Sequence, residues 1–388
     1  MHTATRRRRL VEAAAILAVL SLVYARALPG PFVFDDRATI VENASLRSLW
    51  PLGPVLAQPP DLTTSGRPLV ALSFALDHAL GGFDPRVFHA TSLALHALCA
   101  LLLAAVVRRT LAGPRLGERF AAHAGGLAFA TALLFAVHPL ASELACYASA
   151  RTESLVTAFY LGALYAAIRA RSSARPWGWV ALAIAGSALG MASKEVMASA
   201  PLVIALYDVV FLRPPEAEQK RVRVALWAGL ASTWVVLLAL VLAQPRAQSA
   251  GFALWVTPLV YLANQCRVLP AYLGLVLWPN PMRLDWGLPE PLALGDVWVG
   301  FVFLVALAGL SLYALWRWPA AGFVGVACFA ILAPSSSVVP IVSEVGAERR
   351  MYLPLGALLA GVVCLCWLAL ARTGRARLGA PLVGLAAL

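Results

Sequence analysis

The chain has 388 residues, of which 61% are hydrophobic and only 13% are charged, whereas a soluble domain is about half apolar and a quarter charged. This composition excludes an ordinary soluble protein. Apolar runs long enough to cross a bilayer recur while barrel-like alternation does not, so the sequence predicts an all-α polytopic membrane protein. The net charge of +12 is attributed to membrane topology rather than to nucleic-acid binding, because Lys and Arg are retained on the cytoplasmic side.

The first predicted element is an apolar run over 10–28 behind the basic head Arg6–Arg9. No convincing cleavage site follows the run, so we predict a retained signal anchor with a cytoplasmic N-terminus. A long extracytoplasmic loop follows over 29–84. Within it, residues 67–82 have the pattern of an amphipathic helix lying at the interface, stopped by a glycine pair. Asp84 and Pro85 then suit the N-cap and first turn of the next span.

The whole chain, 1–388, is predicted to form one membrane domain with about 10–11 transmembrane helices. The segment 256–279 is long enough to span but carries Asn264, Gln265 and Arg267, so it is predicted to be a re-entrant or interfacial helix inside a second outer loop, 244–297. The last residues resemble the start of a span that is cut short. The other spans are predicted at about 85–107, 121–137, 153–168, 177–192, 196–212, 224–243, 298–315, 320–338 and 351–371.

The distribution of basic residues supports this order of spans. Nineteen of the 31 Lys and Arg residues fall in the segments assigned to the cytoplasmic side. Counting 256–279 as a true span would invert everything after it and would place Arg372, Arg375 and Arg377 outside, against the positive-inside rule.

Charged residues on the outer face point to chemistry, because charges next to a membrane are costly unless they pair or function. The acidic pair Asp35 and Asp36 follows the first span directly, in the stretch FVFDD. Other outer loops add both acids and cations near the ends of spans. Such a mixture suits a reaction that needs a proton acceptor and a holder for phosphate. A solvated turn after Pro-Gly-Pro is the plainer alternative for the acidic pair.

Five stretches, taken in order, resemble the GT-C superfamily of glycosyltransferases, and most of all the membrane domain of the tetratricopeptide-repeat-containing protein O-mannosyltransferases and their bacterial relatives. They are spread along most of the chain, from 32 to 356, although the repeats themselves are not found in it. The stretches are FVFDD (32–36), RPLVALSFALDHALGGFDPRVFHATSLALHAL (67–98), LLFAVHPLASELACYASARTESL (133–155), MASKEVMASAPLVIALYDVVF (191–211) and ERRMYLPLG (348–356).

The resemblance implies a membrane glycosyltransferase that transfers a sugar from a polyprenyl-phosphate donor to an acceptor hydroxyl on the extracytoplasmic side, with inversion. An Asp of the first outer loop would be the general base. Asp36 is slightly preferred over Asp35 because Arg37 adjoins it, and the other could orient the acceptor or bind a divalent cation. Arg151, Lys194, Arg349 and Arg350 are the candidate ligands of the donor phosphate. The candidate cavity or acceptor residues are Arg37, His138, Glu143, Glu153, Glu195 and Tyr352.

Other functions remain open at this stage. A transporter or lipid flippase would place charges at mid-depth and show repeat symmetry between halves, and a scaffold would not explain the acidic pair. Within the enzyme class, the acceptor could be protein Ser/Thr, a lipid-linked glycan or a lipid A-like molecule. The Ala, Leu and Arg bias suggests a bacterial inner membrane.

Overall fold

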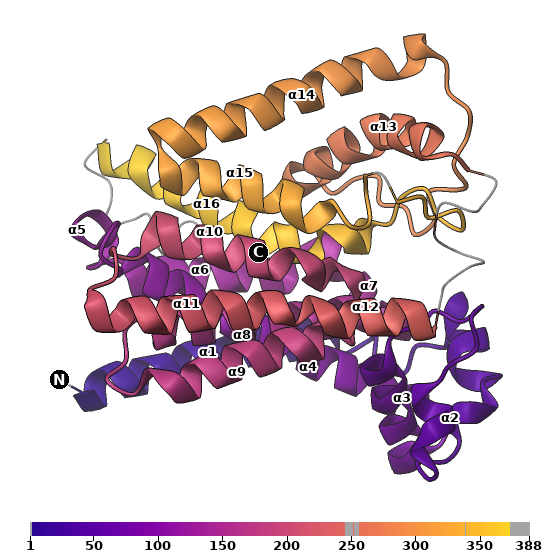
Figure 1. Cartoon of the computed structure of the whole chain (residues 1–388). Helices are drawn as coiled ribbons and strands as arrows, with labels where there is room; N and C mark the ends of the chain where they lie inside the picture. The colour runs from indigo at the N-terminus through magenta and orange to yellow at the C-terminus, as the bar shows by residue number, and fades with distance from the viewer. Residues whose placement is uncertain (1, 245–250, 252–255, 338, 373–388) are drawn as a thin grey trace.

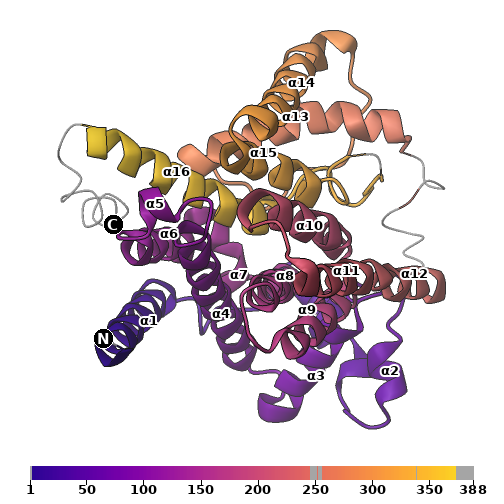
Figure 2. The same ribbon diagram turned by 60° about the vertical axis from the view of Figure 1, so that its left-hand side comes forward.

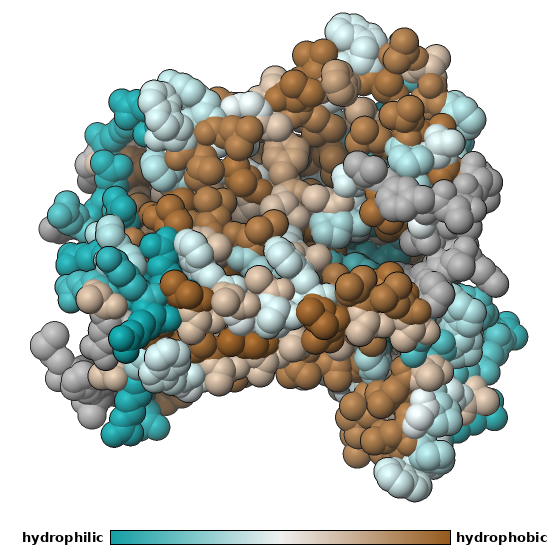
Figure 3. Space-filling model, in the orientation of Figure 1, coloured by the Kyte–Doolittle hydropathy of each residue, from teal (hydrophilic) through white to brown (hydrophobic). Residues whose placement is uncertain are grey.

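The computed structural model describes residues 2–244, 251, 256–337 and 339–372, which form helices and no β-strand. The predicted all-α class is therefore confirmed. The predicted eleventh span lies outside the described residues. The long helices run roughly side by side (Figure 1), and Figure 3 shows a hydrophobic belt across the middle of the molecule with hydrophilic residues gathered at the left. The helices are α1 (His2–Tyr24), α2 (Leu52–Leu56), α3 (Pro68–Gly81), α4 (Pro85–Leu111), α5 (Gly117–Phe120), α6 (Ala124–Val137), α7 (Glu143–Cys146), α8 (Arg151–Ala170), α9 (Pro176–Met191), α10 (Ala200–Phe211), α11 (Ala217–Ser232), α12 (Trp234–Ala243), α13 (Pro258–Leu277), α14 (Leu294–Arg317), α15 (Pro319–Leu332) and α16 (Tyr352–Arg372).

In the part of the chain that the structure describes, five helices are long and apolar enough to cross a membrane, or six if the bent pair α6 and 139–146 forms one span. This number is lower than the ten to eleven predicted, because helices such as α9 and α15 have only 16 and 14 residues and α1 includes the four arginines of its basic head. The predicted boundaries nevertheless agree with the helices observed. Asp84 caps α4 as expected, since its side chain accepts a hydrogen bond from the Arg86 amide.

Two ends of the molecule can be distinguished. The basic end, at the left of Figure 1, holds the start of α1 and the turns after α4, α8 and α10. The loop end, at the right, holds α2, α3 and the long connections that follow α12 and α15. Figure 2 shows α13, α14 and α15 on one flank, α9, α11 and α12 on another, and α10 between them. The sites described below lie at the loop end.

Helix α13 contacts loop-end segments along its whole length. The Tyr261 hydroxyl donates to the Ser335 carbonyl at 2.7 Å, the Gln265 amide donates to the Val345 carbonyl at 2.9 Å, and His138 bonds the Val276 carbonyl. A helix of 20 residues is about 30 Å long, so a transmembrane α13 could not keep both ends in one layer. Helix α12 also ends, and α14 begins, at the right of Figure 1. We therefore propose that α13 enters and leaves at the loop end, although its length and hydropathy would allow a span.

Candidate functional site

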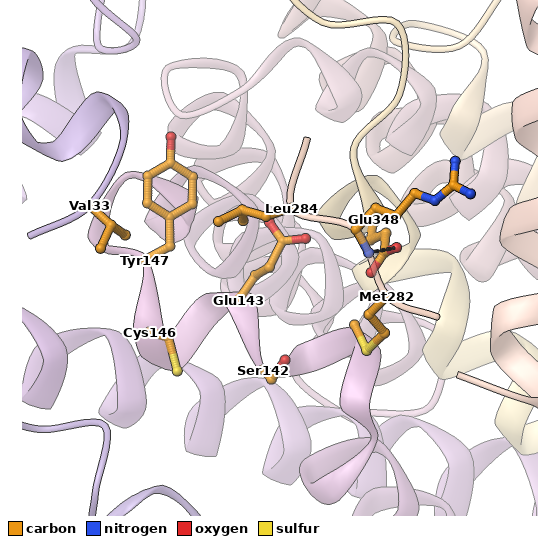
Figure 4. Close-up of a pocket in the computed structure, with 9 residues that line it drawn as sticks. Val33, Ser142, Glu143, Cys146, Tyr147, Met282, Leu284 and Glu348 are labelled. Atoms are coloured by element: carbon orange, nitrogen blue, oxygen red, sulfur yellow. Dashed lines mark hydrogen bonds between the residues drawn. The ribbon is translucent and has the colours of Figure 1, made fainter. Parts of the chain in front are cut away.

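Two adjoining cavities open at the loop end, and both are bordered by Tyr147 and Leu284. The larger, which we call the inner cavity, has a volume of about 300 Å³, and the smaller outer cavity has about 150 Å³. Figure 4 shows residues of the short helix α7 facing the 282–284 segment and Glu348 across the inner cavity. Its lining is Val33, Ser142, Glu143, Cys146, Tyr147, Met282, Arg283, Leu284 and Glu348. The outer cavity is lined by Phe34, Asp35, Tyr147, Leu284, Asp285, Ser343, Glu344 and Arg349.

The acidic pair of the first loop is divided between two environments. Asp35 is exposed and lines the outer cavity, whereas Asp36 is fully buried. The residue before the pair, Phe34, has a φ of 48°, a left-handed conformation that a bulky residue rarely adopts. Strained backbone of this kind is concentrated at functional sites, where the surrounding structure enforces it. The turn at Phe34 thus directly precedes Asp35 and Asp36, whose carboxylates lie in different environments.

Asp36 fastens the first outer loop to the segment before α8. Its carboxylate accepts hydrogen bonds from the Ser149 amide and hydroxyl, both at 2.7 Å, and from the Ala148 amide at 3.1 Å. The Val33 amide adds a fourth bond at 3.3 Å. Burial raises the pKa of Asp36 despite these donors, which act in the opposite direction. With its acceptor sites occupied, Asp36 is placed as a structural anchor of the loop.

Asp35, by contrast, lines the outer cavity together with Tyr147 and Arg349. The Tyr147 hydroxyl donates a hydrogen bond to Asp35 Oδ2 at 2.8 Å. The Arg349 guanidinium carbon lies 5.5 Å from the centroid of the Tyr147 ring, within the range of a cation–π contact. The two aromatic rings of Phe34 and Tyr147 also meet edge to face at 6.4 Å. The geometry therefore favours Asp35, the reverse of the preference drawn from sequence.

Arg349 is held between two carboxylates. One guanidinium nitrogen lies 2.6 Å from Glu344 Oε2 and the other lies 3.4 Å from Glu143 Oε2. The neighbouring Arg350 approaches the same Glu344 oxygen at 3.7 Å. Arg350 is otherwise buried and donates to the Tyr261 hydroxyl and the Ser335 carbonyl. Arg349 and Arg350 were both predicted to bind the donor phosphate. Arg349 lines the outer cavity, whereas Arg350 mainly connects α13 to the loop after α15.

Arg151 occupies a separate, fully buried position. It pairs with Asp77 of α3 at 2.6 Å, donates to the Phe88 carbonyl at 2.7 Å and packs over the Phe74 ring at 4.5 Å. Its side chain is 0% exposed, and it lines neither cavity. Arg151 therefore connects α3, α4 and α8 and is not placed to contact a donor phosphate.

Lys194 forms an ion pair with Glu153, and the adjacent Glu195 pairs with Arg67 at 2.9 Å. Burial lowers the pKa of Lys194 to about 8, while the Glu153 carboxylate opposes this change. The positive charge of Arg349 also lowers the pKa of Lys194. The ammonium group thus lies near the cavity cation, although it does not border either cavity.

Three further predicted residues lie away from the cavities. Arg37 is exposed and pairs with Glu42 at 2.7 Å. His138 is buried and bonds the Val276 carbonyl at 3.1 Å. Tyr352 is buried between helices, where its hydroxyl bonds His96 Nδ1 at 2.6 Å. These side chains serve local structure rather than the cavity.

Several residues that line the cavities were not predicted from the sequence. Tyr147 stood inside a stretch matched to the glycosyltransferases, and that position was a usable signal. Glu344 and Glu348 lay near the predicted arginine pair. The segment Met282–Asp285 had no motif, because it belongs to a loop whose place depends on tertiary contacts such as the 2.6 Å bond from the Arg283 amide to Glu348 (Figure 4).

The sequence left open whether the protein binds a divalent cation. Among the residues that the structure describes, no group of three or more His, Cys, Asp or Glu side chains is arranged to hold a metal ion.

Comparisons with known proteins find relatives of this chain among the protein O-mannosyl-transferases. Protein O-mannosyl-transferase Tmtc1 of Drosophila melanogaster is 28% identical over 94% of this chain and 43% of its own length. Protein O-mannosyl-transferase TMTC1 of Mus musculus is 40% identical over 38% of this chain and 16% of its own length. For TMTC4 of Homo sapiens the identity is 31%, over 50% of this chain and 28% of that protein.

The chain resembles the protein O-mannosyl-transferases. The resemblance inferred from the sequence is thereby confirmed. The chain spans less than half the length of these O-mannosyl-transferase relatives. No protein-family profile matches it, and no solved structure matches it.

Proposed function

We propose that this chain transfers a sugar from a polyprenyl-phosphate donor to an acceptor hydroxyl on the extracytoplasmic side of a membrane, with Asp35 as the general base. The observation that carries the proposal is that Asp35 and Arg349 line one cavity at the loop end. A proton acceptor and a fixed cation are the two groups that this reaction requires.

The reaction would proceed by direct displacement. The acceptor hydroxyl gives its proton to the Asp35 carboxylate while its oxygen forms a bond to the anomeric carbon. The bond from that carbon to the phosphate oxygen breaks on the opposite face, which inverts the configuration. The electron pair leaves with the polyprenyl phosphate, and Arg349 stabilises the negative charge that develops there.

The Tyr147 hydroxyl would hold Asp35 in place, since it donates a hydrogen bond to Asp35 Oδ2 at 2.8 Å. Glu344 Oε2, which lies 2.6 Å from Arg349 and 3.7 Å from Arg350, occupies the place that a phosphate oxygen would take between two guanidinium groups. Donor binding would therefore require Glu344 to give up its contact with Arg349.

The test uses the full chain in lipid nanodiscs with polyprenyl-phosphate mannose and a Ser/Thr peptide. Release of polyprenyl phosphate and formation of glycopeptide are both measured. Asp35→Asn should lower kcat by about 100-fold or more. Asp61→Asn, which changes an exposed acid of the same loop outside both cavities, is the matched control and should retain normal turnover. Full activity of Asp35→Asn would refute the assignment of the base, and no turnover with any donor would refute the glycosyltransferase itself.

A further inference from the structure

The two cavities are lined by more acidic than basic side chains. Five carboxylates line them, whereas two guanidinium groups do. Arg349 is already engaged by two of the acids, and the Arg283 guanidinium lies 5.5 Å from the Trp286 ring. The five acids are Asp35, Glu143, Asp285, Glu344 and Glu348.

The two acids at the mouth are without a cation in the described part of the chain. Asp35 accepts from the neutral Tyr147 hydroxyl at 2.8 Å, and Asp285 accepts from the Gly287 amide at 2.8 Å. Both side chains are exposed. Each therefore keeps its negative charge available to a molecule that approaches from the water.

A third acid has an unused acceptor inside the inner cavity. Glu143 is only 7% exposed, and its Oε1 atom has no hydrogen-bond partner among the described residues. Figure 4 shows this carboxylate between Tyr147 and Glu348, in the middle of the lining. A buried acceptor that lacks a donor is energetically costly, so a ligand that brings a hydrogen-bond donor or a cation to this point would be favoured.

The mouth also offers apolar surface next to its charges. Phe34 is 60% exposed and Leu284 is 38% exposed, and both border the outer cavity with Asp35 and Asp285. Lys and Arg side chains suit such a surface, because their aliphatic stems cover apolar groups while their charged ends contact carboxylates. An acidic acceptor would instead meet charge of its own sign at the mouth.

We propose that the acceptor is a polypeptide segment whose Ser or Thr is flanked by Lys or Arg, and that Asp285 at the mouth selects this positive charge. The proposal rests on the proposed function, because it names the acceptor for that same site. It follows from the excess of carboxylates, the free oxygen of Glu143 and the apolar groups at the mouth.

The experiment separates binding from transfer. Peptides in which Ala replaces the acceptor Ser or Thr are made with Lys, Gln or Glu at the flanking positions. Their dissociation constants are measured by fluorescence anisotropy with the full chain in nanodiscs of zwitterionic lipid. The Lys peptide should bind about tenfold more tightly than the Glu peptide, with Gln between them. This preference should shrink strongly in about 0.5 M NaCl.

Reversal of the charge at Asp285 tests whether this residue selects the positively charged peptide. Asp285→Lys should reduce or reverse the preference for Lys, whereas the control Asp61→Lys should leave it unchanged. Equal affinity for all three peptides would overturn the proposal. Transfer is then measured with Ser and Thr peptides. Sugar transfer at the same KM to Lys and Glu peptides would overturn the proposed selectivity and leave the glycosyltransferase standing, while absence of transfer to every acceptor would count against the proposed function.

Discussion

The Tyr147 hydroxyl donates a hydrogen bond to Asp35 across 112 residues of chain, at 2.8 Å. Burial raises the pKa of Tyr147, so the phenol stays protonated and remains a donor at physiological pH. The bond orients the carboxylate toward the cavity that Arg349 also lines. This contact therefore joins the first outer loop to the segment before α8 at the point where chemistry is proposed.

Removal of that hydroxyl is the first prediction. Tyr147→Phe should lower kcat by about threefold to tenfold, the value of one hydrogen bond, with little change in the KM of the donor. Steady-state release of polyprenyl phosphate measures this. Tyr165→Phe, at the other end of α8, is the control and should behave as the wild type. An unchanged kcat for Tyr147→Phe would mean that the bond does not orient the base.

The second prediction concerns Asp36 as an anchor. Asp36→Ala removes an acceptor that serves four donors, and leaving such buried donors unsatisfied should cost roughly 2–4 kcal/mol of stability. The melting temperature in detergent should fall clearly. Ser149→Ala, which removes one donor and leaves the two backbone bonds of Ala148 and Ser149, should cause a smaller fall. If Asp36→Ala melted normally but lost all turnover, Asp36 would be the base instead.

The third prediction tests whether Arg151 stabilises the fold or binds the donor phosphate. Asp77→Asn leaves the Arg151 guanidinium buried without its partner charge, which should destabilise the protein by about 3–5 kcal/mol. The double variant Asp77→Leu/Arg151→Met removes both charges and should recover most of the stability. Thermal unfolding in detergent and the KM of the donor are both measured. A stable double variant with a greatly raised donor KM would show that Arg151 contacts the phosphate after all.

The fourth prediction concerns the carboxylate that holds Arg349. Glu344→Gln should free the guanidinium and lower the KM of the donor by about threefold to tenfold, because phosphate no longer competes with a charged side chain. Glu290→Gln, in an exposed loop position, is the control. A rise in donor KM would instead indicate that Glu344 positions Arg349 for the phosphate.

The fifth prediction is a pH dependence that arises from Lys194. Burial lowers its pKa from 10.5 to about 8, so the unfolded chain binds more protons than the folded protein between these two values. Stability should therefore rise with pH through this window, by up to about 3 kcal/mol. Unfolding is followed from about pH 7 to pH 10.

Lys194→Met should remove this rise, whereas Lys220→Met, an exposed lysine at the basic end, should retain it. Any contribution of the Lys194 charge to donor binding should be lost as the pH rises through about 8. A stability that falls with pH in the wild type and not in Lys194→Met would contradict the direction assigned to the shift.

The sequence by itself determined the class of the protein and the position of most helices. Apolar runs must form hydrogen-bonded helices in a bilayer, and local signals such as Asp84 before Pro85 mark where a helix begins. Ordered stretches such as FVFDD and ERRMYLPLG also sufficed to indicate the relatives. These features depend on residues close together in the chain, so they can be read without a structure.

Only the tertiary structure decided which charged residues share a cavity. Asp35 and Asp36 are equivalent by composition, and their separation depends on the turn at Phe34 and on donors 112 and 113 residues away. Arg151 and Arg349 likewise differ only through their partners, since Asp77 engages the first in a buried site and Glu143 and Glu344 hold the second beside the cavity. The physical reason is that burial and pairing of a charge are set by contacts between distant segments, about which a local pattern carries no information.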